Sequence, residues 1–359
     1  MTDTHDDSLI IRTWYEIAVH ALESRASDIH IEAGPQGTVV RIRVDGLLQV
    51  QSQYRIELHE RLITRIKILA RLDIAEKRLP QDGRLLIGQD FAKPSIDCRV
   101  SIVPTLYGEK AVVRILPGCV EELGLEHIGL LPEQLEILQK ALGQTDGLIL
   151  VTGPTGSGKT RTLYSCLRQL NQNHRNLCSI EDPIEIRLSG VNQVAYHPRA
   201  GLDFPTIIRA LLRQDPDVIM IGEIRDGATA QLAIQAAQTG HLVLSTLHTR
   251  NARGAIGRLK SLGIDEESLQ SCLRSVSSQR LVRKICPNCM GKEHSEDPRC
   301  PACKGTGLRG RLGVHEVLSA KHLFDSSLKH PTMHDAGLSH LHNGLIRRID
   351  LEAEVNTWH

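Results

Sequence analysis

The sequence predicts a mixed α/β protein in which a parallel sheet follows a smaller α+β domain, and three observations carry this prediction. In the second part of the chain, short and continuously apolar runs alternate with helical patterns, as in strands buried on both faces of a sheet. One of these runs leads into a glycine-rich loop and then a helical pattern. The first third instead shows strands of alternating polarity around two helical segments, which indicates a separate α+β domain.

In this first domain, expected at residues 1–116, residues 8–26 and 57–72 have the apolar spacing of amphipathic helices. Asp45-Gly46 lies between two alternating runs and predicts a β-hairpin. The expected strands are residues 27–32, 39–44, 47–50, 83–87, 95–101 and 109–116.

A linker is expected at residues 117–126, because Pro117-Gly118 and two glutamates interrupt the regular patterns. Residues 127–359 then form the second domain, where a helix after Pro132 precedes the first strand. The strands expected there are residues 147–152, 177–180, 218–221 and 242–246. Their buried character predicts a RecA-like domain in outline.

The glycine-rich loop reads Gly153-Pro154-Thr155-Gly156-Ser157-Gly158-Lys159-Thr160. Glycine lets the backbone curl so that successive N–H groups point at phosphates, and the helix that begins near Gly158 adds its positive dipole end. Lys159 would supply charge to the β- and γ-phosphates, and the Thr160 hydroxyl a ligand to Mg²⁺. The pattern therefore predicts a nucleoside triphosphate site with Mg²⁺; a glycine-rich surface turn is the alternative.

A phosphate-binding loop needs a carboxylate to hold Mg²⁺ or polarise the attacking water, and two acids end apolar runs here. They are Glu181 and Glu223. The usual acid would fall at Gly222, so we expect these two glutamates to share its duties. The alternatives are an exposed loop acid for Glu181 and a charge near a helix N-terminus for Glu223. His241 and His248 flank the last strand, either in functional contact or as structural residues.

Four cysteines have metal-ligand spacing. Cys286, Cys289, Cys300 and Cys303 form C-x₂-C-x₁₀-C-x₂-C, which predicts a closed, structural Zn²⁺ site within residues 286–303 rather than disulfides or free thiols. The remaining cysteines stand in apolar contexts typical of buried, reduced thiols. They are Cys98, Cys119, Cys166, Cys178 and Cys272.

Composition narrows the class of protein. The formal net charge is +1 and aromatic residues make up 3%, so neither a general attraction to nucleic acid nor many base-stacking platforms is expected. The acidic start is unlike a signal peptide, and no apolar run is long enough for a membrane span. These features predict a cytoplasmic protein.

Several ordered blocks together resemble the secretion ATPase superfamily, which powers type II secretion, type IV pilus assembly and DNA-uptake competence pili. Besides the glycine-rich loop, the blocks are Ser27-Asp28-Ile29-His30-Ile31-Glu32, Pro80-Gln81-Asp82-Gly83-Arg84, Ile180-Glu181-Asp182-Pro183-Ile184-Glu185, Leu212-Arg213-Gln214-Asp215-Pro216-Asp217, Gly222-Glu223-Ile224-Arg225-Asp226 and Gly240-His241-Leu242-Val243-Leu244-Ser245-Thr246-Leu247-His248-Thr249. The resemblance runs from residue 27 to about residue 318. It implies a RecA-like P-loop ATPase domain with a zinc-binding insertion, preceded by a PAS-like α+β domain.

The resemblance also implies site roles and a hexameric ring. Glu181 is similar to the family's Asp-box glutamate and Glu223 to its atypical Walker B glutamate, with His241 and His248 as its histidine box. ATP would bind between the two domains and the neighbouring subunit. Arginines of the first domain would reach the phosphates, and the matching strands offer Arg84, Arg99 and Arg114, each of which could instead be a surface residue.

The implied partner is an inner-membrane platform protein, with the ring peripheral at the inner face of the cell membrane. The cysteine cluster favours filament assembly, because retraction ATPases of the family generally lack it. The sequence departs from the family at Arg250-Asn251, and about 26 residues before the first block leave no room for the family's extra docking domain. Two alternatives remain open: a nucleic-acid translocase with a zinc finger, and a nucleotide-binding scaffold without turnover.

Overall fold

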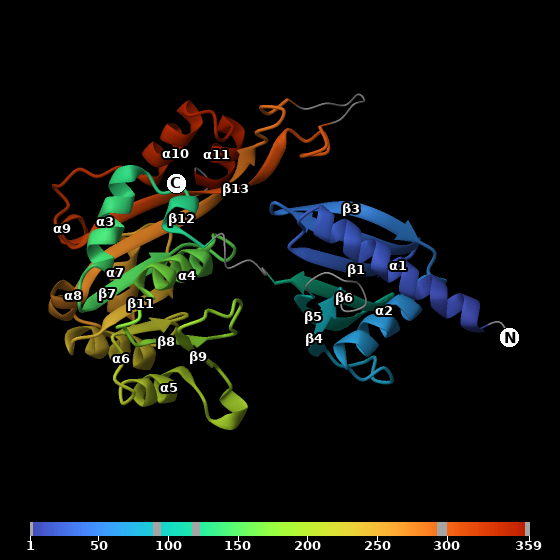
Figure 1. The fold of residues 1–359 in the computed structure, drawn as a ribbon, viewed down its shortest axis with the longest axis horizontal. Coiled ribbons are helices and arrows are strands. Elements are labelled where there is room, and N and C mark those ends of the chain that lie inside the picture. The colour runs from blue at the N-terminus through green and yellow to red at the C-terminus, as the bar shows by residue number, and fades with distance from the viewer. Residues whose placement is uncertain (1–2, 89–94, 117–122, 293–299, 356–359) are drawn as a thin grey trace. The chain divides into compact units, whose positions relative to one another are not determined.

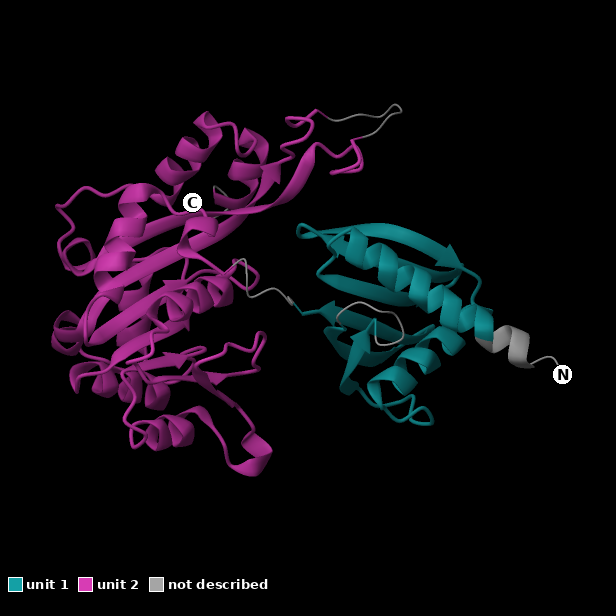
Figure 2. Ribbon diagram, viewed as in Figure 1, with its two compact units in different colours: residues 1–118 teal, residues 119–359 magenta. Residues whose placement is uncertain are grey.

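The computed structural model describes residues 3–88, 95–116, 123–292 and 300–355 and divides the chain into two compact units, Met1–Gly118 and Cys119–His359 (Figure 2). Each unit has its own sheet and its own apolar core. Residues 117–122 lie outside the described residues, so the linker expected at 117–126 stays a prediction.

Unit 1 is a six-stranded antiparallel sheet with two helices on one face. The strand order is β3-β2-β1-β6-β5-β4. The elements, all but β2 labelled in Figure 1, are α1 (Asp3–Glu23), β1 (Asp28–Gly34), β2 (Gly37–Val44), β3 (Leu47–Tyr54), α2 (Glu57–Ala70), β4 (Gln81–Ile87), β5 (Ile96–Thr105) and β6 (Gly108–Ile115).

The core of unit 1 forms where the two amphipathic helices meet alternate residues of the strands. Trp14 and Ile17 of α1 and Ile66 of α2 pack against Ile29 of β1 and Val100 of β5. Because side chains alternate across a strand, the residues next to these core positions lie on the opposite face of the sheet.

The hairpin predicted at Asp45-Gly46 is present between β2 and β3. Val44 pairs with Leu47, and the two turn residues have φ of 48° and 91°. Positive φ at both central positions defines the tight hairpin turn whose twist matches the flanking strands, which explains the Asp-Gly pair.

Unit 2 is a seven-stranded sheet of order β13-β12-β7-β11-β10-β8-β9. Its strands are parallel except for β13, which pairs antiparallel with β12. The strands are β7 (Gly147–Thr152), β8 (Leu177–Glu181), β9 (Val191–Ala195), β10 (Val218–Ile221), β11 (Leu242–Leu247), β12 (Leu273–Ile285) and β13 (Leu308–Ser319). The helices are η1 (Leu125–His127), α3 (Pro132–Leu142), α4 (Lys159–Leu170), η2 (Pro198–Ala200), α5 (Phe204–Leu211), α6 (Gly227–Gln238), α7 (Gly254–Ser261), α8 (Glu266–Cys272), α9 (Ala320–Phe324), α10 (Met333–His342) and α11 (Arg348–Val355).

Helices cover both faces of this sheet, which is why its central strands are apolar throughout. Ile149 and Val151 of β7 belong to one core with residues of α3 and α4, whereas Leu148 and Leu150 belong to another with residues of α5 to α8. Parallel strands end at a common edge, so the loops that follow β7, β8, β10 and β11 meet at one edge of unit 2. Among the described helices, none has the length and apolar character that crossing a membrane would require.

Candidate functional site

The loop after β7 has the backbone of a phosphate cradle. Gly153, Gly156 and Gly158 have φ of 142°, 80° and 90°, values that favour glycine. A Cβ on Gly153 would lie 2.6 Å from the carbonyl oxygen of Gln279, so that position admits no side chain. Nothing lies within 4 Å of a Cβ placed on Gly156, which leaves the mouth of the loop open.

Lys159 and Thr160 begin α4 at the end of this loop. The Lys159 Nζ donates to the carbonyl oxygens of Gly153 and Pro154, both at 2.9 Å, so the ammonium lies across the loop. Burial lowers the pKa of Lys159, and the Glu223 carboxylate acts in the opposite direction. Thr160 is exposed in the first turn of the helix. The loop can thus present N–H groups, an ammonium and a hydroxyl to a polyphosphate.

Glu223 and His248 come together at the edge of the sheet next to the phosphate loop. The His248 Nε2 lies 3.1 Å from Glu223 Oε1, and Arg225 Nε donates to Glu223 Oε2 at 3.0 Å. Asp226 is the N-cap of α6, so Glu223 lies three residues before the cap of that helix. A Cβ on Gly222 would lie 3.0 Å from the carbonyl oxygen of Ile180, a tight contact that a larger residue would relieve only by a small shift of this neighbour.

Glu181 is buried at the end of β8, with 3% of its surface exposed. Tyr164 of α4 donates its hydroxyl to Oε2. Ser179 and Gln193 donate to Oε1 at 2.6 and 3.0 Å. Both carboxylate oxygens therefore have protein donors, and Glu181 is not the exposed loop acid of the alternative interpretation. The network fixes the end of β8 to the helix that follows the phosphate loop.

The two histidines lie at opposite ends of β11. Leu247, next to His248, pairs with Thr152 at the start of the phosphate loop, whereas Leu242, next to His241, pairs with Gly147 at the far end of β7. With a rise of about 3.3 Å per residue, the two histidines are roughly 23 Å apart along the strand. His241 Nδ1 lies 3.1 Å from the carbonyl oxygen of Ala236, and the structure does not bring it to the loop.

Arg84, Arg99 and Arg114 form one row across unit 1. Arg84 is opposite Arg99 on the next strand, and Arg99 is opposite Arg114. The row lies on the face that the helices leave uncovered, and Arg114 Nε pairs with Asp28 at 3.0 Å. The sequence had indicated these arginines one by one; their alignment comes from strand register.

Sequence reasoning did not identify several residues that support the phosphate loop. Gln279 of β12 donates to the Ser157 carbonyl oxygen at 2.7 Å. A hollow of about 170 Å³ beside the loop is lined by Gly153, Pro154, His248, Thr249, Arg250 and Arg280. Arg250 stands in the sequence only as a departure from the family, whereas Gln279 and Arg280 belong to no local motif. Only the pairing of β12 with β7 could have indicated Gln279 and Arg280.

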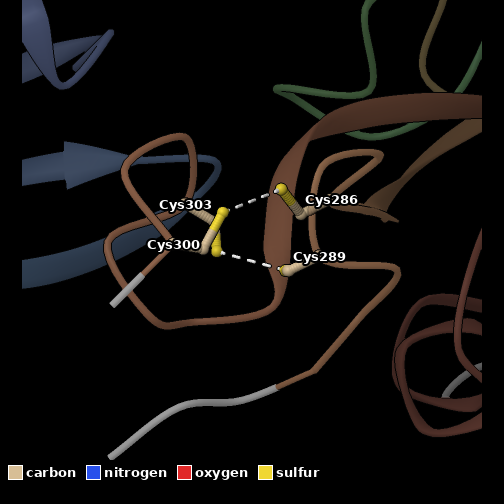
Figure 3. Close-up of side chains that lie close together, drawn as sticks. All are labelled: Cys286, Cys289, Cys300 and Cys303. Carbon is tan, nitrogen blue, oxygen red and sulfur yellow. Dashed lines mark hydrogen bonds between the residues drawn. The ribbon is translucent and has the colours of Figure 1, made fainter. Parts of the chain in front are cut away.

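The four clustered cysteines face one another at the ends of β12 and β13 (Figure 3). Their sulfur atoms all lie within 4.8 Å of one another, with Cys286–Cys300 at 3.9 Å and Cys289–Cys303 at 3.6 Å. These distances exclude disulfides, whose S–S bond is about 2.05 Å. The backbone N–H groups of Cys303 and Ala302 lower the pKa of the Cys300 thiol to about 7, whereas burial and the neighbouring thiols raise the pKa of Cys289 to about 12. Of these two thiols, only Cys300 therefore favours the thiolate that a metal requires.

The other described cysteines are buried, free thiols, as expected; Cys119 lies outside the described residues. Burial raises the pKa of Cys98, Cys166, Cys178 and Cys272, so these thiols remain protonated. They fill the cores of the two units.

Known proteins similar to this chain are secretion proteins. The type II secretion system protein HxcR of Pseudomonas aeruginosa is 47% identical over 319 residues, which cover 88% of this chain and 68% of the relative. The type II secretion system ATPase E of Vibrio cholerae is 40% identical over 356 residues, covering 94% of this chain and 70% of the relative. This chain thus spans about two thirds of the length of these relatives.

Solved structures similar to this chain are also of secretion and pilus ATPases. The pilus retraction motor PilT, solved with bound ADP, is 27% identical with a TM-score of 0.65, and the match covers 94% of this chain and 96% of PilT. The ATPase DotB of Legionella pneumophila shares the fold, with a TM-score of 0.73 at 21% identity over 94% of this chain and 93% of DotB. The family model described as type II/IV secretion system protein matches residues 3–343. Since that match spans both units, the chain belongs to the type II/IV secretion system protein family, whose members are ATP-hydrolysing enzymes.

Proposed function

We propose that this chain is the motor subunit of a filament-assembling secretion system and that its site is completed by Glu223. The observation that carries the proposal is the contact between Glu223 and His248 at 3.1 Å, on the edge of the sheet where the phosphate loop begins. An acid held there by a histidine and an arginine can orient a water toward the terminal phosphate of a bound nucleotide.

In this proposal the residues 153–160 bind the phosphates and Thr160 holds Mg²⁺, together with Glu223 through water. The open space at Gly156 and the ammonium of Lys159 fit a polyphosphate. Bound Mg²⁺ would neutralise charge on the β- and γ-phosphates. Glu181 would have a supporting role, because it fixes β8 to α4 through Tyr164. His241 lies at the other end of β11 and has no role at this edge of the sheet.

Four thiolates would hold Zn²⁺ as a structural clip. A tetrahedral site with Zn–S bonds of about 2.3 Å has sulfur–sulfur edges of about 3.8 Å. The observed distances of 3.9 and 3.6 Å fit these edges, and Cys286, Cys289, Cys300 and Cys303 leave no position for a substrate. Zinc there would connect the ends of β12 and β13.

The finer architecture belongs to the same proposal. Unit 2 would be the RecA-like domain and unit 1 the PAS-like domain of a homohexameric ring, with Arg84, Arg99 and Arg114 reaching the phosphates. The ring would be cytoplasmic, held at the inner face of the cell membrane by a platform protein, and would assemble a type II pseudopilus, type IV pilus or competence pilus. No direct contact with nucleic acid is proposed.

The test is ATP hydrolysis by purified protein with Lys159→Ala and a control, Lys140→Ala. Lys140 is exposed on α3 and pairs only with Glu136 among the ion pairs of the described residues. We expect Lys159→Ala to abolish turnover and Lys140→Ala to keep it. Background hydrolysis by a wild-type hexamer would instead support a scaffold, and salt-dependent stimulation by single-stranded DNA would support a translocase.

A further inference from the structure

Strand β12 runs alongside the start of the phosphate loop. It pairs in parallel with β7, and Ser278 is opposite Thr152, the last residue of β7. Gln279 and Arg280 therefore lie beside the first residues of the loop. Because neighbouring side chains of a strand point to opposite faces, this dipeptide reaches two different elements at once.

Gln279 holds the phosphate loop. Its side chain is buried, with Nε2 donating to the Ser157 carbonyl oxygen at 2.7 Å and Oε1 accepting from the Thr162 hydroxyl at 2.8 Å. Its own carbonyl oxygen occupies the space that a side chain on Gly153 would need. Gln279 thus ties the loop to the first turn of α4.

Arg280 holds the loop that follows β11, residues 248–252, which we name the histidine loop. Arg280 is 4% exposed, and its Nη2 donates to the Arg250 carbonyl oxygen at 2.9 Å while Nη1 donates to Gln279 at 3.0 Å. At the other end of the histidine loop, Ala252 donates its N–H to Glu316 at 2.8 Å. The loop is therefore fixed at Arg250 and at Ala252.

Arg280 carries a buried charge into this position, where the Glu354 and Glu316 carboxylates favour the charged form without forming an ion pair with it. Within the described ranges, no ion pair involves Arg280, and its Nε is buried without a hydrogen-bond partner. Burial lowers the pKa of the Arg280 guanidinium, and Glu354 and Glu316 only partly oppose this effect. Arg280 in turn lowers the pKa of Lys159, so the two cations share one electrostatic environment. A buried cation is costly unless anions compensate it, and phosphates bound at the loop would do so.

We propose that Gln279 and Arg280 form a brace that sets the phosphate loop and the histidine loop relative to each other, with Arg280 as the positioning residue that keeps His248 against Glu223. The proposal rests on the proposed function, since the brace matters only if ATP is hydrolysed at this edge. The guanidinium fork is the essential part. It donates to two carbonyls at once, whereas an ammonium on a flexible stem has no fixed fork.

The test is Arg280→Lys, with Arg274→Lys as the matched control. Arg274 lies on the same strand and also joins it to a neighbour, but through Asp146 at 2.5 Å, at the far end of β7. In Arg280→Lys we expect kcat to fall about tenfold, KM for ATP and the affinity for ADP to change less than twofold, and amide exchange in residues 248–252 to increase. In Arg274→Lys all of these should remain at wild-type values.

Two results would overturn the brace. One is an Arg280→Lys protein with wild-type kcat and wild-type exchange at residues 248–252. The other is loss of the cooperative unfolding of unit 2 in that variant, which would make Arg280 a structural core residue. Wild-type protein that hydrolyses no more ATP than Lys159→Ala would refute the proposed function instead, and the exchange measurement would still decide whether Arg280 holds the loop.

Discussion

Glu181 and Glu223 end neighbouring strands of unit 2, but their surroundings predict different results for the same substitution. Glu223 is partly exposed and contacts His248 and Arg225. Glu181 is buried and accepts from Tyr164, Ser179 and Gln193. In a glutamine at 181, one oxygen becomes an NH₂ group that faces existing donors, which leaves buried groups unsatisfied.

We therefore expect Glu223→Gln to lower kcat for ATP hydrolysis by about 10² to 10⁴, with no change in thermal stability. Glu181→Gln should instead lower the midpoint of thermal unfolding, because its buried network loses on the order of 1–3 kcal/mol. Steady-state kinetics and calorimetry on both variants check this. If Glu181→Gln kept wild-type stability and lost turnover, the water-orienting role would belong to Glu181.

The sequence predicted those residues whose positions follow from local order. A glycine-rich loop after a buried strand and acids at strand ends are local patterns, so 153–160 and Glu223 could be identified. Tyr164, Gln279 and Arg280 could not, because each acts on a residue that strand pairing or helix packing brings near. Gln279 and Ser157, for example, are 122 positions apart.

Among the secondary-structure elements, β12 and β13 are joined by the segment that contains the four clustered cysteines, for which we predict bound zinc. Wild-type protein should contain about one Zn²⁺ per chain, and Cys300→Ser should lose it because a thiolate ligand is gone. Metal analysis after purification without chelators gives the number, and proteolysis of residues 286–308 reports the local loosening. Cys98→Ala is the control, since Cys98 lies in the core of unit 1. A zinc-free wild type would refute the site.

Two buried histidines contact the carbonyl oxygens of Ile128 and Gly129 near the start of unit 2. Their protonation makes the stability of the protein depend on pH. His315 of β13 is fully buried, with Nε2 2.9 Å from the Ile128 carbonyl oxygen and Nδ1 3.4 Å from the Ser277 hydroxyl. Burial lowers its pKa to about 4. Nearby, His340 contacts the Gly129 carbonyl oxygen at 3.0 Å, and burial lowers its pKa as well.

Because the folded pKa of His315 lies below the unfolded value of about 6.5, the unfolded chain binds more protons between these values. The contribution of His315 to the free energy of unfolding is therefore fully present above pH 6.5. It is lost as the pH falls toward 4, by on the order of 3 kcal/mol. We expect His315→Gln, which can still donate to Ile128, to reduce this loss. Calorimetry of the protein at pH 5 and 7.5 measures this loss of stability from the unfolding of unit 2. The control is His127→Gln, which changes an exposed histidine and should lose as much stability as wild type. If His315→Gln also lost as much as wild type, His315 would not be the cause of the pH dependence.

At the scale of the whole molecule, the polarity pattern of the strands indicated two domains. Strands of alternating polarity in the first third of the sequence give way to continuously apolar strands. The structure contains two units, each with its own sheet. The pairing of strands within each unit could not be predicted from the sequence. For example, no local pattern shows that Arg84, Arg99 and Arg114 lie in one row. That row makes the proposed ring testable, since unit 1 holds the arginines and unit 2 the phosphate loop.

If the arginines complete the site of a neighbouring subunit, two inactive proteins should restore activity when mixed. One is Lys159→Ala, and the other carries Arg84→Ala, Arg99→Ala and Arg114→Ala. In randomly mixed rings about one quarter of neighbouring pairs join an intact phosphate loop to intact arginines, so ATPase activity should reach about a quarter of wild type. Lys159→Ala mixed with Glu223→Gln is the control, because both lesions lie in unit 2 beside one loop, and it should stay inactive. If the first mixture also stays inactive although mixed rings form, the arginines serve their own subunit or none.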